Sequence, residues 1–124
     1  MEPVLLVPET VAREDGVGAE IALGKENGKP LLFTLGITRI LEQESLDISV
    51  WGSTDKMSWR QLATYPQKFY CGTYLMMVDL ARHKEIQYLR AQWRMSRWGV
   101  GDPVALADFF LFAEEATAHA ASAA

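Results

Sequence analysis

The clearest structural signal in this 124-residue chain runs Leu46-Asp47-Ile48-Ser49-Val50-Trp51, followed directly by Gly52-Ser53-Thr54-Asp55. In the first part, apolar and polar residues alternate with the two-residue period of a half-buried β-strand. The second part has the small and polar residues of a turn, in which we expect Asp55 to bond its own backbone. Trp59 to Leu62 follow at a distance that lets them pair with the first strand. We therefore expect a β-hairpin here.

Strand-like patterns continue on both sides of this hairpin. The segment 31–41 is rich in β formers and largely uncharged on both faces, which is typical of a central strand covered on both sides. Shorter strands are expected at 4–7, 19–23 and 74–80. Between them, the segment 24–30 contains Asn27-Gly28, a pair that tolerates positive φ. This segment predicts a hairpin-type reversal.

Two later segments fit either a strand or a helix. Residues 86–95 alternate well, with Leu89, Ala91, Trp93 and Met95 facing inward, and we favour a strand there. Residues 106–113 read as a fully buried final strand, although Asp102-Pro103 could also begin a helix. The Ala-rich tail 116–124 has no large apolar side chains, so we expect it to be loose or disordered.

The number of strands predicts the fold class. About eight short strands, with turn signals about every 8–14 residues, indicate an all-β antiparallel sandwich of jelly-roll type. With 49% hydrophobic residues, a chain of this length suits one domain, which we place at residues 1–115.

Bulk composition narrows the range of functions. A net charge of −4 argues against a general nucleic-acid binder. The apolar runs are far shorter than the ~20 residues of a membrane-spanning helix. The N-terminus lacks the basic and apolar regions of a secretory signal, so we expect a cytoplasmic protein. The single cysteine, Cys71, cannot form an internal disulfide.

One part of the chain is similar to a known family. Ser53, Asp55 and Trp59 match the Ser-x-Asp-Gly-x-x-Trp hairpin of discoidin-type, galactose-binding-like domains, and Tyr88-Leu89-Arg90 resembles a later strand of that family. Lys56 stands where the family has a turn glycine, and the family's terminal cysteine pair is missing. The resemblance implies an eight-stranded jelly roll with Trp59 in its core. It also implies a non-catalytic domain that binds sugars, lipids or proteins through loops at one end.

The residues that carry chemistry are few and scattered. The two histidines, His83 and His119, and Cys71 do not have the spacing of a zinc site, and no nucleophile or phosphate-loop motif is present. We therefore expect no enzyme activity, no metal and no cofactor. Three carboxylates, Glu42, Glu44 and Asp47, lie close in sequence and form either a solvated turn or a weak calcium site.

The candidate contact residues lie in two loops. Arg97, Trp98 and Asp102 form a loop whose glycines let Trp98 project, and the aromatic-rich segment 63–73 contributes Tyr65 and Tyr70. Trp98 either contacts a partner or folds back to cap the sandwich.

A basic strip precedes the first of these loops. It consists of Arg82, Lys84, Arg90, Arg94 and Arg97, interleaved with Trp93 and Trp98. Such strips can bind single-stranded nucleic acid, but Arg90 and Arg94 share a strand face, where pairing with acids such as Glu20 or Asp47 is the usual outcome. We expect no nucleic-acid partner.

The sequence favours a non-catalytic structural or binding subunit that docks into a larger protein assembly. Its partner would be another protein or further copies of the chain, because surplus apolar surface usually ends in an interface. The alternative is a carbohydrate-binding, lectin-like module that uses the loop aromatics.

Overall fold

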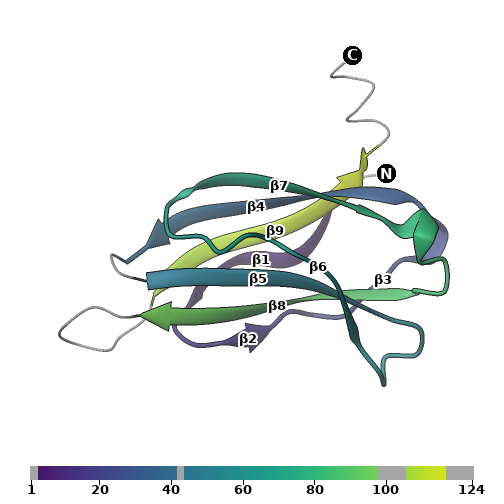
Figure 1. Ribbon diagram of the computed structural model, residues 1–124, viewed down its shortest axis with the longest axis horizontal. Coiled ribbons are helices and arrows are strands. Elements are labelled where there is room, and N and C mark those ends of the chain that lie inside the picture. The colour runs from purple at the N-terminus through teal and green to yellow at the C-terminus, as the bar shows by residue number, and fades with distance from the viewer. Residues whose placement is uncertain (1–2, 42–43, 98–105, 117–124) are drawn as a thin grey trace, which may run out of the picture.

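The chain folds into two antiparallel β-sheets that pack face to face (Figure 1). The computed structural model describes residues 3–41, 44–97 and 106–116. These residues form an all-β sandwich, as the sequence predicted. Of the predicted tail, only Ala116 lies within the described residues, and it is buried.

Nine strands make up the two sheets. Sheet A has the order β1 (Val4–Ala12), β9 (Ala107–Glu115), β4 (Pro30–Ile40) and β7 (Gly72–Asp79). Sheet B has the order β2 (Gly16–Val17), β8 (Tyr88–Arg97), β5 (Glu44–Ser53) and β6 (Arg60–Thr64), and β3 (Ile21–Ala22) also pairs with β8. If β2 and β3 are counted as two pieces of one strand, the order is compatible with an eight-stranded jelly roll.

The predicted alternation places the core. Leu46, Ile48 and Val50 of β5 are completely buried between the sheets, and the neighbouring strand β8 adds Ala91, opposite Val50, and Leu89, opposite Gly52. The segment 86–95 is therefore a strand rather than a helix. The predicted hairpin is also confirmed, because β5 pairs with β6 in antiparallel register.

The final strand is confirmed, but it is not buried on both faces. Phe109 and Leu111 of β9 point into the core and are fully buried, whereas Phe110 and Phe112 point outward and are only partly covered. The prediction of a fully buried strand is wrong on this point. In the middle of sheet A, however, β4 is buried on both faces, as the sequence predicted for this segment, since the outward-pointing Leu32 and Thr34 are only 5% and 8% exposed.

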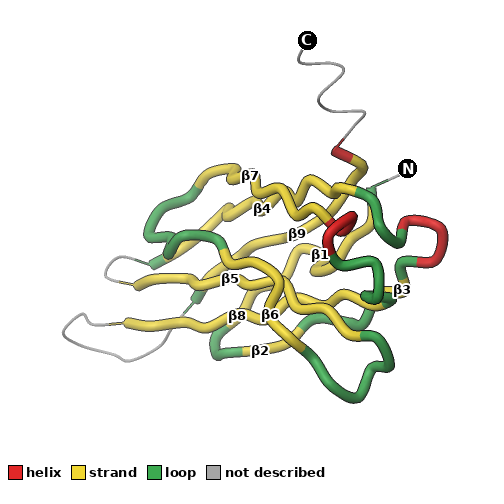
Figure 2. Tube along the Cα trace, turned by 45° about the vertical axis from the view of Figure 1, so that its right-hand side comes forward, coloured by secondary structure: helices red, strands yellow, loops and turns green. Residues whose placement is uncertain are grey.

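The segment 24–30 does not close a hairpin. The strand before it, β3, belongs to sheet B, and the strand after it, β4, belongs to sheet A, so the chain crosses between the sheets here. A short 3-10 helix, η1 (Gly24–Glu26), makes part of this crossing. Asn27 donates hydrogen bonds from its side-chain amide to the main-chain oxygens of Lys84 and Ile86. These bonds tie the crossing to the connection after a second 3-10 helix, η2 (Leu80–Arg82), at the same end of the sandwich (Figure 2).

Trp59 is not a core residue. It is half-buried beside the β5–β6 turn, where its Nε1 donates to the main-chain oxygen of Lys56 at 3.1 Å. The guanidinium of Arg90 lies 4.2 Å from the centre of its ring. The core role that the family resemblance implied for Trp59 is therefore wrong. Within the described residues, no helix has the length and apolar character needed to cross a membrane.

Candidate functional site

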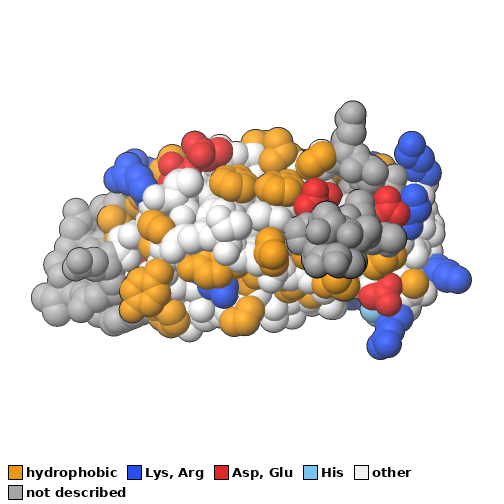
Figure 3. Space-filling model, turned by 90° about the horizontal axis from the view of Figure 1, so that it is seen from above, with side chains coloured by type: hydrophobic (Ala, Val, Ile, Leu, Met, Phe, Trp, Pro, Cys, Tyr) orange, Lys and Arg blue, Asp and Glu red, His pale blue; other side chains and the backbone are white. Residues whose placement is uncertain are grey.

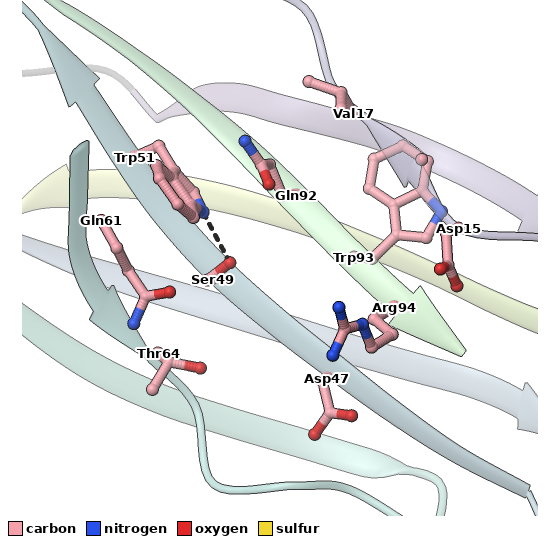
Figure 4. Close-up of a pocket in the computed structure, with 11 residues that line it drawn as sticks. Asp15, Val17, Asp47, Ser49, Trp51, Gln61, Thr64, Gln92, Trp93 and Arg94 are labelled. Carbon is pink, nitrogen blue, oxygen red and sulfur yellow. Dashed lines mark hydrogen bonds between the residues drawn. The ribbon is translucent and has the colours of Figure 1, made fainter. Parts of the chain in front are cut away.

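A polar groove of about 560 Å³ lies on the outer face of sheet B (Figure 4). Its side chains come from three neighbouring strands and from the segment around β2. The strands contribute Asp47, Ser49 and Trp51 from β5, Gln61 and Thr64 from the β6 side, and Gln92 and Arg94 from β8. On β5 and β8 these are the residues that alternate with the buried ones, and they therefore face away from the core.

The strand register brings these side chains into rows. Asp47 lies opposite Arg94, and Ser49 lies opposite Gln92 on one side and Thr64 on the other. Figure 4 shows the Arg94 side chain pointing toward Asp47. The groove therefore combines one pair of opposite charges with several neutral donors and acceptors.

Hydrogen bonds fix some of the groove side chains and leave others available. The Nε1 atom of Trp51 donates to the Ser49 hydroxyl at 2.8 Å, which sets the orientation of the indole. Asp47 accepts a hydrogen bond from Gln67 at 3.3 Å. By contrast, Gln61 and Gln92 form no side-chain hydrogen bond within the described residues.

Trp93 forms one wall of the groove and is anchored firmly. Its Nε1 donates to the main-chain oxygen of Glu14 at 3.1 Å, and its ring meets Phe109 edge to face at 5.4 Å between centroids. Gly16 packs directly against the indole, since a Cβ atom there would lie 2.4 Å from the ring. Asp15 is held nearby by the main-chain N–H of Met95, which donates to its carboxylate at 2.7 Å.

The β5–β6 turn borders this face of sheet B. The carboxylate of Asp55 accepts hydrogen bonds from the main-chain N–H groups of Ser58 at 3.0 Å and Met57 at 2.8 Å. These bonds hold the pKa of Asp55 below its ordinary value. The predicted turn role of Asp55 is thus confirmed. Lys56, where the resembling family has glycine, adopts the left-handed conformation with φ of 68°.

A second notable surface is the outer face of sheet A. Leu5, Leu75 and Met77 are 51%, 55% and 60% exposed, and Phe110 and Phe112 lie beside them with their rings stacked 6.1 Å apart. The strand register places three of them in one row across the sheet: Leu5 pairs with Phe112, Phe112 with the buried Thr34, and Thr34 with Leu75. Figure 3 shows hydrophobic side chains gathered on this side of the molecule. We call these five apolar residues the sheet A face.

The predicted contact residues are divided by the structure. Tyr65 is 2% exposed and sits inside the sandwich, so in this fold its side chain does not reach a surface partner. Tyr70 is 76% exposed. The backbone of Arg97 ends β8, whereas Trp98 and Asp102 lie outside the described residues.

The described end of β8 and the segment before Tyr70 lie at the same end of the sandwich. Lys68, two residues before Tyr70, pairs with Leu46 at the start of β5. Arg97 pairs with Glu44 on the other side of the same strand. The loop 66–71 and the end of β8 therefore flank the beginning of β5, and a joint contact site at this end stays a prediction.

Of the three carboxylates considered for calcium, the two that the structure describes, Glu44 and Asp47, do not converge. Glu44 is buried, and its oxygens accept from the main-chain N–H groups of Leu106 at 2.9 Å and Leu41 at 3.4 Å. Asp47 points to the opposite face of β5, into the groove. Glu42 lies outside the described residues.

The basic strip is likewise divided. Arg90 stacks on Trp59, and Arg94 is the cross-strand neighbour of Asp47, one of the acids that the sequence suggested for it. The Nδ1 atom of His83 lies 3.3 Å from a guanidinium nitrogen of Arg60, and the same guanidinium donates a hydrogen bond to the Glu85 carboxylate. These three side chains lie on the surface. The hydrogen bond from its own main-chain N–H and then the one from Arg60 hold the pKa of Glu85 below its ordinary value.

Sequence reasoning did not identify the groove. Its signal was present, since Asp47, Ser49 and Trp51 occupy the outward positions of a predicted strand. Which residues of β6 and β8 lie beside them depends on strand register, and register is set by contacts distant in sequence. Comparison with known proteins adds no assignment: no protein-family model matches the chain, and no curated protein is significantly similar to it.

Proposed function

We propose that this protein is a non-catalytic structural or binding subunit that docks into a larger protein assembly through the sheet A face. The observation that supports this proposal is the group of apolar side chains on the sheet A face, in which Leu5, Leu75 and Met77 are each more than half exposed. Contiguous apolar surface of this kind is uncommon on monomeric proteins and usually marks an interaction site.

The partner that suits this surface is a protein with an apolar face of its own. The sheet A face is the outer side of a sheet, against which another sheet can pack about 10 Å away. Burying a large apolar side chain completely contributes about 1.5–3 kcal/mol, so covering five of them supplies a substantial driving force. A second copy of this chain meets the same requirement, and the experiment below separates the two cases.

The positions of His83 and Cys71 support a non-catalytic role. These are the residue types best suited to acid–base and nucleophilic catalysis. His83 follows η2 after one end of β7, and Cys71 immediately precedes the other end, so the whole of β7 separates them. The cytoplasmic location and the lectin-like use of the end loops, with exposed Tyr70 as a contact, stay predictions.

The experiment compares two exposed methionines. The tagged full chain is expressed in its source organism as wild type, as Met77→Lys and as Met57→Lys. Met57 is 85% exposed in the β5–β6 turn, outside the sheet A face, and is the matched control. We expect a defined complex with the wild type and Met57→Lys, and its loss with Met77→Lys, while circular dichroism shows all three folded.

One further measurement and one replacement variant complete the test. Light scattering of the purified chain shows whether copies of the chain make up the assembly: in that case Met77→Lys is monomeric and Met57→Lys is not. Leu75→Lys replaces Met77→Lys if the latter does not fold. The proposal would be contradicted if every variant gave the same complex as the wild type, or if the wild type gave no complex.

A further inference from the structure

We propose that the polar groove on sheet B is a binding site for a neutral oligosaccharide that lies along β5. This inference is independent of the docking function, because the groove and the sheet A face are on opposite sides of the sandwich. It also differs from a lectin-like role of the end loops, because it uses side chains from the middle of the strands.

The shape of the site suits an extended ligand. A volume of about 560 Å³ falls within the range of about 300–1,000 Å³ that is usual for small-ligand sites. The lining residues spread along β5 from Asp47 to Trp51 and are flanked by side chains of β6 and β8, so a linear chain of sugar rings can lie along β5. The backbone beneath it is already hydrogen-bonded in the ladders of β5 with β6 and β8. Recognition must therefore come from side chains, which argues against an added peptide strand.

The polar side chains match hydroxyl groups. A sugar hydroxyl both donates and accepts, and the amides of Gln61 and Gln92 and the hydroxyl of Thr64 can do the same. The side-chain amides of Gln61 and Gln92 have no hydrogen-bond partner within the described part of the chain, and both amides reach into the groove (Figure 4). A ligand can use them without breaking a bond of the folded protein.

Trp51 provides the apolar part of the site. Figure 4 shows its indole between Gln61 and Gln92. The C–H face of a pyranose ring is apolar and packs well on an aromatic ring, while its hydroxyls point to the sides. Because the bond to Ser49 already fixes the indole, little conformational entropy is lost when a sugar stacks on it.

The charges favour a neutral ligand over an anionic one. Asp15 and Asp47 place two carboxylates in the groove against the single guanidinium of Arg94. A polyanion such as a nucleic acid or a sulfated glycan would need an excess of positive charge. Asp47 and Arg94 together offer an acceptor and a forked donor at one end of the groove, which suits a pair of neighbouring hydroxyls.

The first test is an NMR titration of the ¹⁵N-labelled full chain. The probes are cellohexaose, chitohexaose and laminarihexaose, with a heparin hexasaccharide as the anionic comparison. We expect at least one neutral probe to shift the indole N–H of Trp51 and the side-chain amides of Gln61 and Gln92 at millimolar concentration. The proposal is overturned if no neutral probe shifts these groups, or if the heparin fragment alone does so.

The second test compares two half-buried tryptophans of sheet B. Trp51→Ala should weaken binding of the active probe by at least about tenfold, as expected for a central aromatic contact. Trp59→Ala is the control, because Trp59 borders the same sheet but does not line the groove, and it should change affinity by less than about twofold. The reverse order, or equal effects, would overturn the assignment.

Two further variants secure the result. Gln92→Ala removes a side chain without internal partners, so it tests the site even if Trp51→Ala does not fold, and it should also weaken binding. Met77→Lys on the sheet A face should leave sugar binding unchanged. Loss of sugar binding in Met77→Lys would contradict the groove as the site. So would an unchanged affinity in both Gln92→Ala and a folded Trp51→Ala.

Discussion

The hydroxyl of Tyr65 donates a hydrogen bond to the main-chain oxygen of Phe33 at 2.9 Å inside the sandwich. Tyr65 directly follows β6 of sheet B, and Phe33 lies in the middle of β4 of sheet A. Both residues are buried, at 2% and 0% exposure. The two sheets are therefore joined by a directional polar contact as well as by apolar packing.

Removing this hydroxyl should destabilise the fold by about 1 kcal/mol or slightly more, because the bond is lost inside the core while the ring still fills its space. Tyr65→Phe makes this change, and chemical denaturation measures it. Tyr70→Phe, which removes a hydroxyl from an exposed side chain, is the matched control and should unfold at the wild-type denaturant concentration. Equal midpoints for Tyr65→Phe and the wild type would show that the bond contributes nothing.

The same residue predicts a loss of stability in alkali. Burial raises the pKa of Tyr65 in the folded state above its ordinary value near 10. Above about pH 10 the unfolded chain releases this proton while the folded chain retains it, so the free energy of unfolding falls as pH rises. Tyr65→Phe should show a smaller fall than the wild type when denaturation curves at about pH 8 and about pH 11 are compared. A fall of the same size in both proteins would argue against this source.

The turn residue Lys56 offers a stabilising substitution. A left-handed conformation costs a non-glycine residue about 1–2 kcal/mol, and Lys56 adopts it with φ of 68°. We expect Lys56→Gly to offset part of this cost and raise the thermal midpoint. Lys56→Ala is the control, since it also removes the ammonium that lies 4.9 Å from the Tyr88 ring but retains the Cβ. A midpoint for Lys56→Gly no higher than that of Lys56→Ala would refute the backbone explanation.

Neighbouring phenylalanines of β9 should respond very differently to truncation. Phe109→Ala empties a fully buried position and should cost about 3–5 kcal/mol. Phe110→Ala removes a partly covered ring from the sheet A face, and we expect it to cost less than half as much. Urea unfolding of the two variants measures the difference, and similar costs would mean that the outer face is covered in solution.

The sequence was most informative where the signal is local. The alternation around Leu46, Ile48 and Val50 identified a strand, a turn and a returning strand, because all three depend on neighbouring residues. Residues 86–95 were assigned correctly on the same basis. Period-two patterning determines which face of a strand is buried without reference to the rest of the chain.

The sequence was least informative where a residue's role depends on distant partners. Asn27-Gly28 looks like a hairpin turn, but its flanking strands join different sheets and the Asn27 side chain bonds residues of the β7–β8 connection. Trp59 looks like a core anchor, but it stacks with Arg90 at the sheet surface. Tyr65 looks like a loop contact, but Phe33 provides a buried acceptor for it. Each outcome is set by sheet pairing, which a local pattern does not encode.

The regularity of β7 has a consequence for how this protein behaves at high concentration. Along one flank of the sandwich, β1 is interrupted by register shifts near Val7, and β2 and β3 are two separate pairs of residues. By contrast, β7 pairs with β4 without interruption from Gly72 to Asp79, and it is an edge strand of sheet A among the described strands. Long, regular and weakly charged edges are the places where a foreign strand can add, and proline or charge normally blocks them. Because Leu75 and Met77 of the sheet A face lie on this same strand, the β7 edge offers both backbone groups and exposed apolar side chains to an added strand at high protein concentration.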